Sequence, residues 1–155
     1  MATSWIEQKA EEYKRKEEIL QFEAEARRHQ FAVIQSRWQE VKRDLEKVVR
    51  DTVAEWNAAL PQEENRIDVV ESTPREFRIH KKHYPGGVIV VTFNPVAHCF
   101  QCELMKLRPG QVSASPNCKI FSLRMADDDS IYITDDGNAH VSAGQIAKLF
   151  IESLA

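Results

Sequence analysis

Residues 88–93 read VIVVTF, a run of β-branched and aromatic residues that is apolar on both faces. A strand that is covered on at least part of both sides has this pattern, whereas a strand with one face in water alternates apolar and polar residues. The nearby segment 76–80, EFRIH, does alternate, with Phe77 and Ile79 on one face and charged residues on the other. Together the two segments predict a central strand beside a strand with one packed and one partly wet face.

Similar short runs follow along the chain, and we predict strands near 66–71, 76–81, 88–93, 99–105, 119–125 and 130–134. Residues that favour turn dihedrals separate them, at Ser72-Thr73-Pro74, Tyr84-Pro85-Gly86-Gly87, Asn94-Pro95, Arg108-Pro109-Gly110, Ser115-Pro116-Asn117 and Asp127-Asp128-Asp129. Short turns join neighbouring antiparallel strands. The pattern therefore predicts an antiparallel meander of about five to six strands.

A long N-terminal helix is predicted before the strands, because Thr3 to Leu60 contains no proline or glycine and Pro61 follows. Its apolar residues recur at a three-four spacing, as in a coiled coil, with charged residues interrupting at Glu17 and Arg27. The spaced residues are Ile6, Ala10, Tyr13, Leu20, Ala24, Phe31, Ile34, Trp38, Val41, Leu45 and Val48. Beyond Leu45 the apolar residues shift to Val49, Val53, Trp56 and Leu60, which is typical of a helix lying on a sheet.

The first half of this helix is highly charged. Residues 7–28 contain seven acidic and six basic side chains, with acid-before-base pairs at Glu11/Arg15, Glu12/Lys16 and Glu23/Arg27. Such a helix is marginal alone and gains stability by packing on something else. We expect a solvated arm that folds back, pairs with a second copy or binds another protein.

A second helix is predicted at the C-terminal end of the sequence. Ser142 and Gln145 have the spacing of a capping box, and Val141 is placed to contact Ile146. Its apolar stripe is Ile146, Leu149, Phe150 and Leu154. The predicted fold class is α+β, with residues 1–60 as a helical arm whose second half packs on the sheet and 61–155 as a sheet domain closed by the C-terminal helix.

Composition limits the classes of partner. The 155 residues are 43% hydrophobic and 29% charged with a formal net charge of −3, so bulk charge does not indicate nucleic acid or an anionic membrane. No segment approaches the roughly 18 apolar residues of a membrane span, and the N-terminus has no apolar signal region. Three cysteines, an odd number, favour reduced thiols. We expect a soluble, cytoplasmic protein without a membrane partner.

The sharpest motif is Cys99-Phe100-Gln101-Cys102, which follows His98, with Cys118 further along the chain. Zinc prefers four thiolate or imidazole ligands in a tetrahedron. On a strand, however, residues three apart face opposite sides, so Cys99 and Cys102 reach one ion only if a bulge intervenes. Packing as small apolar residues is the favoured interpretation, and a zinc-stabilised domain through the three cysteines is an alternative.

A basic, aromatic run is the second candidate site. It consists of Arg75, Arg78, His80, Lys81, Lys82 and Tyr84, on one strand and the loop after it. A wet sheet face with these side chains could bind an anion or nucleic acid. The alternative is a solvated hairpin whose lysines prevent edge-to-edge strand pairing.

Clustered aspartates at 127–129 and 135–136 could ligate calcium or magnesium, but their spacing matches no EF-hand loop and turn formation accounts for them. The sequence also contains no nucleophile elbow, phosphate-binding loop, dinucleotide fingerprint or helical metal motif. We therefore expect a non-enzymatic interaction or scaffold protein without a cofactor. The residues we expect to contact a second copy or another protein are Trp5, Tyr13, Leu20, Phe31, Ile34 and Trp38.

Overall fold

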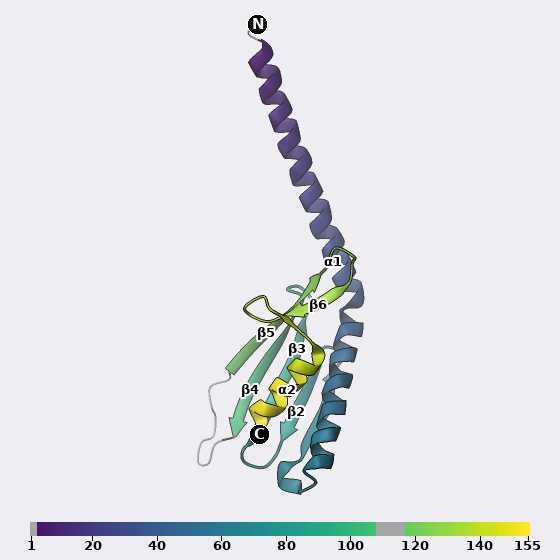
Figure 1. Ribbon diagram of the computed structural model, residues 1–155, viewed down its shortest axis with the longest axis vertical. Helices are drawn as coiled ribbons and strands as arrows, with labels where there is room; N and C mark the ends of the chain where they lie inside the picture. Colours follow the sequence, from purple (N-terminus) through teal and green to yellow (C-terminus); the bar gives the residue numbers. More distant parts are fainter. Residues whose placement is uncertain (1–2, 108–116) are drawn as a thin grey trace. The chain divides into compact units, whose positions relative to one another are not determined.

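The computed structural model describes residues 3–107 and 117–155 and confirms the α+β class (Figure 1). The elements in chain order are α1 (Thr3–Ala59), the 3-10 helix η1 (Glu63–Asn65), β1 (Ile67–Thr73), β2 (Glu76–Lys81), β3 (Gly86–Asn94), β4 (Cys99–Leu107), β5 (Asn117–Met125), β6 (Ile131–Thr134), β7 (His140–Val141) and α2 (Ala143–Leu154). The predicted turns at 108–110 and 115–117 lie in or overlap 108–116, outside the described residues.

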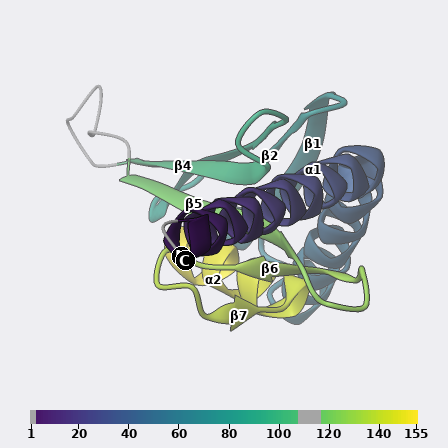
Figure 2. The ribbon, with the colours of Figure 1, turned by 90° about the horizontal axis from the view of Figure 1, so that it is seen from above.

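The sheet is an antiparallel meander in which the order of the strands in space is their order in the chain, β1 to β7. The described residues form seven strands, more than the five to six predicted, because the two-residue β7 pairs with β6 through His140 and Val141. A strand of two residues shows no alternation, so the sequence contains no pattern from which to predict it. In Figure 2, β6 and β7 turn out of the plane of β2 and β4.

Strand β3 is central, with β2 on one side and β4 on the other. Ile89, Val91 and Phe93 point to one face and are buried, whereas Val88 and Val90 point to the other and are half-buried. The apolar character of both faces thus reflects one face under the helices and one face shielded only in part.

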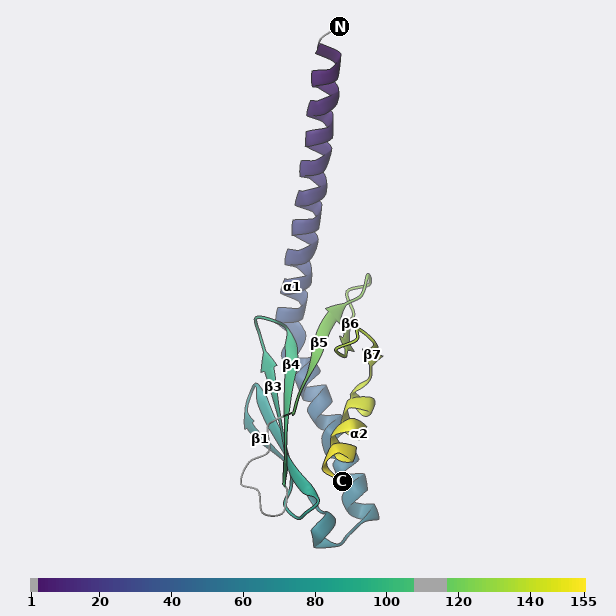
Figure 3. The same cartoon turned by 90° about the vertical axis from the view of Figure 1, so that its left-hand side faces the viewer.

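One face of the sheet carries the core, beneath α2 and the part of α1 that begins at Ile34 (Figure 3). Leu45 and Val49 of α1 and Ile146 of α2 are at most 1% exposed, against Phe77 and Ile79 of β2. The predicted capping box at the start of α2 is confirmed. Gln145 N–H donates to Ser142 Oγ at 3.1 Å, and Ser142 N–H donates to Gln145 Oε1 at 2.8 Å.

Helix α1 ends at Ala59, one residue before the predicted limit, and side chains near its end fix the path into β1. Trp56 Nε1 donates to Asn65 O at 2.7 Å. The Asn57 amide donates to Ile67 O at 2.8 Å and accepts from Ile67 N–H at 3.0 Å. These bonds satisfy backbone groups at the start of β1 that a sheet edge would otherwise leave unpaired.

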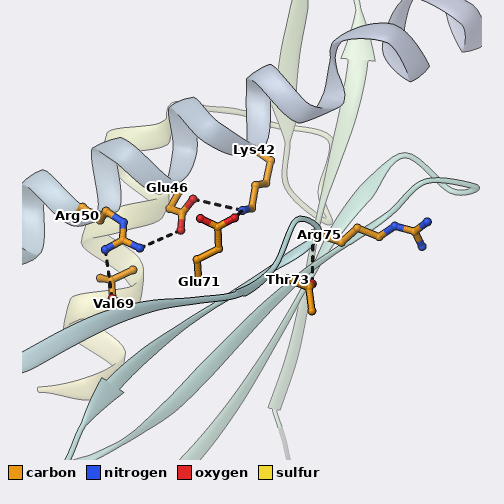
Figure 4. A network of polar contacts seen from close by, with 7 residues as sticks. All are labelled: Lys42, Glu46, Arg50, Val69, Glu71, Thr73 and Arg75. Carbon is orange, nitrogen blue, oxygen red and sulfur yellow. Dashed lines mark hydrogen bonds and ion pairs between the residues drawn. The ribbon is translucent and has the colours of Figure 1, made fainter.

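A partly buried network of ion pairs and hydrogen bonds joins α1 to β1 (Figure 4). Lys42 Nζ lies 3.2 Å from Glu46 Oε2 and 3.5 Å from Glu71 Oε1, and Arg50 Nη2 lies 3.2 Å from Glu46 Oε1. Arg50 also donates to Val69 O at 3.2 Å. Lys42 and Glu46 are 4% and 7% exposed. Two buried charges are tolerated here because each has an opposite charge within hydrogen-bonding reach.

The chain divides into two compact units, one ending at Val33 and the other beginning at Ile34. The second unit holds the sheet, α2 and the C-terminal part of α1. None of the helices in the described part of the chain is both long enough and apolar enough to cross a bilayer.

Candidate protein-interaction surface on α1

The first unit is a helix whose apolar residues follow a heptad register. The positions of this register, six apolar and two charged, are Ile6, Ala10, Tyr13, Glu17, Leu20, Ala24, Arg27 and Phe31, and we call them the α1 seam. Residues at this spacing share one face of a helix. Ile6, Tyr13 and Leu20 are 53%, 67% and 60% exposed. The seam therefore presents large apolar side chains to solvent.

The same register continues into the second unit with the opposite outcome. Ile34, Trp38 and Leu45 occupy its next positions and are buried in the core of that unit. Of the residues that we expected to contact a partner, the structure thus leaves Trp5, Tyr13, Leu20 and Phe31 exposed and places Ile34 and Trp38 inside.

Charged side chains in the seam and beside it support the helix. Glu23 lies 3.7 Å from Arg27 across one helical turn, and Lys9 lies 3.3 Å from Glu12. The Lys16 ammonium is 6.0 Å from the centroid of the Tyr13 ring. Exposed pairs of this kind contribute only about 0.2–0.5 kcal/mol each to helix stability. They help residues 3–33 stay helical without covering the seam.

Three other large apolar side chains among the described residues of the first unit lie off the seam. Trp5, Ile19 and Phe22 are 62%, 58% and 73% exposed and fall at other heptad positions. Phe22 is the most exposed of these and differs from Tyr13 by little more than its position and one hydroxyl. It offers a matched control for substitutions in the seam.

The structure does not bring the three cysteines together. Alternation along β4 places Cys102 on the helix-covered face and Cys99 on the other, and Cys118 lies opposite Glu103 on that second face. All three are free thiols, and burial raises the pKa of Cys99 and of Cys102. Among the described residues no three His, Cys, Asp or Glu side chains are grouped to hold a metal ion.

The basic run is also divided between the two faces. Lys81 is 2% exposed, and its ammonium donates to the carbonyls of His83 and Pro85 within the loop that follows β2. Arg78 and His80 lie on the opposite, open face. Arg75, Lys82 and Tyr84 are exposed in the loops at the two ends of β2.

Carboxylates surround the basic side chains of the open face. Arg78 Nε donates to Glu76 Oε1 at 2.8 Å, and Asp68 lies across from His80. Glu103 lies two strands from Arg78 in the same cross-strand row. This balance of charge lowers the attraction of the face for an anion.

The aspartates shape turns. Asp128 Oδ1 accepts from the Ser130 backbone at 3.1 Å and from the Ser130 hydroxyl at 2.6 Å, which lowers the pKa of Asp128. Asp135 Oδ1 accepts from Gly137 N–H and from Ala139 N–H, both at 2.9 Å. One carboxylate oxygen of Asp128 and one of Asp135 are thus engaged by the loops that contain them.

Sequence reasoning missed an open groove of about 400 Å³ between β5 and α2, which Lys119, Phe121, Asp136 and Leu149 help to line. It arises because β6 pairs with β5 only from Ser122 to Met125. The difference in length between the predicted strands 119–125 and 130–134 is the signal that could have indicated it. The groove brings one lysine near carboxylates and contains no nucleophile–base pair among its lining residues.

Comparison of the chain with protein-family models, with curated proteins and with solved structures finds no match.

Proposed function

We propose that this chain is a protein-interaction module that binds a protein surface, either a second copy of itself or another protein, through the α1 seam. The observation that carries the proposal is the exposure of Ile6, Tyr13 and Leu20 at successive heptad positions of one helix. Single exposed apolar residues are ordinary, but a row of them along one helix face is the geometry of a helix–helix contact.

The free energy available to the seam is sizeable. Covering a large apolar side chain contributes about 1.5–3 kcal/mol relative to leaving it in water. Covering three such residues, together with Phe31, contributes more free energy than the exposed ion pairs contribute within the helix. A partner helix that covers the seam therefore stabilises both itself and residues 3–33.

The test compares the mass of the full chain with that of two variants by light scattering over a range of concentrations. Tyr13→Glu with Leu20→Glu places charges in the seam and should abolish assembly, whereas Phe22→Glu, off the seam, should leave it intact. Assembly that is lost equally in both variants, or kept in both, would contradict the seam as the contact surface.

Salt separates this proposal from the anion-binding alternative. Nucleic-acid binding weakens steeply as salt rises because counterions are released, whereas contact through an apolar seam tolerates salt. We expect the assembled mass to change little between low and high ionic strength. If the assembly contains nucleic acid and releases it at high salt, that result would favour nucleic-acid binding by Arg78 and the neighbouring basic residues instead.

A cytoplasmic location is part of the proposal. It is supported by three free cysteines, one of which, Cys118, is exposed. Unpaired exposed thiols persist in reducing compartments. Thiol labelling of Cys118 in intact cells, before and after lysis, tests it, and a disulfide-linked Cys118 would contradict it.

A further inference from the structure

We infer that the α1 seam binds the seam of a second copy of this chain in antiparallel orientation, centred between Glu18 and Ile19. The inference rests on the proposed function and adds the identity, direction and register of the occupant.

A parallel, in-register pair places like charges together. Glu17 would face Glu17 of the second copy inside the contact, and Arg27 would face Arg27. In the flanking positions Lys9 would lie beside Lys14 of the second copy. Charges of one sign that are desolvated against each other are costly, so parallel pairing is disfavoured twice within the seam and again beside it.

Antiparallel pairing about the Glu18–Ile19 centre removes these contacts. Ile6 then lies opposite Phe31 of the second copy, and Tyr13 opposite Ala24. Glu17 lies opposite Leu20, and Arg27 lies opposite Ala10, whose small side chain leaves room for the aliphatic part of the arginine side chain. Each large side chain on the Tyr13–Ala24 and Arg27–Ala10 layers meets a small one, which is how facing helices interdigitate.

The flanking charges are complementary in the same register. Lys16 lies beside Glu23 of the second copy, and Glu7 lies beside Arg28. Because the contact is two-fold symmetric, each of these pairs occurs twice. The remaining flanking pairs, Lys9 with Gln30 and Lys14 with Gln21, place a lysine beside a neutral amide.

Shifting the antiparallel pair by one heptad is worse in either direction. One shift places Lys14 beside Lys14 and Lys16 beside Lys16. The other gains Glu17 opposite Arg27, but it places Lys14 beside Arg28 twice. That shift also requires Ile34, which is 2% exposed in the core of the second unit, to enter the contact. The central register alone pairs the exposed seam from Ile6 to Phe31 without a like-charge contact.

Spin-label distances test the direction and register in the full chain. Glu11, Glu18 and Glu25 lie one heptad apart at the same outer position, so each is replaced by a labelled cysteine in a Cys118→Ser background in which Cys99 and Cys102 stay buried. The inferred pair brings the two labels at 18 level with each other. It separates the labels at 11, and those at 25, by roughly 20 Å along the axis, given a rise of about 1.5 Å per residue.

Each outcome decides the inference separately from the proposed function. A minimum at 18 with longer, similar distances at 11 and 25 is the expected result. Equal distances at all three positions mean a parallel pair and overturn the inference while leaving the seam as the contact. A minimum displaced toward 11 or 25 overturns the register. A monomeric mass overturns the inference and leaves binding to a different protein as the proposed function.

Charge reversal gives a second readout of the same pair. Arg28→Glu should weaken dimerisation roughly tenfold at low salt, because two attractive contacts with Glu7 become repulsive. Adding Glu7→Lys should restore the affinity. In a parallel pair Arg28 contacts Glu23 instead, so adding Glu7→Lys would not restore the affinity. That result would overturn the inference. Arg15→Glu, at an outer position, controls for the change in net charge.

Discussion

Trp38 of α1 stacks on Phe93 of β3, with ring centroids 4.5 Å apart and ring planes 12° from parallel. Phe93 in turn makes an edge contact with Phe100 of β4, with centroids 5.2 Å apart. This aromatic cluster holds the helix to the central strands, so the part of α1 that carries Trp38 is core and not arm.

Trp38→Ala should therefore lower the free energy of unfolding by about 3–5 kcal/mol, the usual cost of deleting a large aromatic side chain from a core. Urea unfolding of the full chain, followed by circular dichroism, measures the change. Phe22→Ala removes an aromatic side chain that is 73% exposed and should change stability by less than about 0.5 kcal/mol. Similar losses in the two variants would contradict the assignment of Trp38 to the core.

The ion-pair network predicts that the Glu46 side chain contributes strongly to stability. Glu46→Ala leaves the buried Lys42 with only Glu71, whose side chain is 52% exposed, and should cost about 3–5 kcal/mol. Glu71→Ala removes a partner that is largely in water and should cost less than about 1 kcal/mol. The two variants are compared by urea unfolding at one ionic strength. Equal costs would show that Lys42 does not depend on Glu46.

Stability should fall in mild acid because of His98. Its ring is buried, its Nε2 lies 2.9 Å from Gln35 Oε1, and burial lowers the pKa of His98 below its ordinary value of 6.5. A group whose folded pKa is lowered adds its full stability above the unfolded pKa and loses it as the pH falls through the folded pKa. Unfolding measured from pH 7.5 downward should show this decline starting near pH 6.5.

His98→Asn is the variant that checks the assignment. His98 has a φ of 51°, a left-handed conformation that asparagine tolerates better than most residues. Asparagine does not titrate in this range, so the part of the decline that begins near pH 6.5 should disappear. An unchanged profile would assign the decline to carboxylates.

Replacement by alanine should change stability in opposite directions at two glycines. A Cβ at Gly87 would collide with the backbone carbonyl of Met105 on β4, so Gly87→Ala should cost at least about 2 kcal/mol. At Gly144, in the first turn of α2, the nearest atom to an added Cβ is Ser142 Oγ at 3.8 Å. Gly144→Ala should stabilise the protein by about 0.5–1 kcal/mol. Thermal unfolding of the two variants measures both, and a stable Gly87→Ala protein would contradict the close approach of β3 and β4.

Local patterns in the sequence were sufficient to predict most of the helices and strands of this fold. Six of the strands, the long first helix and the capping box at Ser142 follow from periodicity, turn residues and proline placement, which act over a few neighbouring residues. β7 and the 3-10 helix η1 were not predicted, because elements of two or three residues are too short to show a period.

Tertiary structure alone decided which apolar residues are covered. Ile6 and Leu45 belong to the same heptad register, yet Ile6 is 53% exposed and Leu45 is 1% exposed. Strand alternation already places Lys81 and Arg78 on opposite faces of β2, but only the tertiary structure decided that the face of Lys81 is the covered one. The sequence by itself therefore determined the α+β elements and the heptad spacing of α1. The sheet decided where the core ends along that helix, because burial depends on which distant residues meet and not on the spacing of the residues themselves.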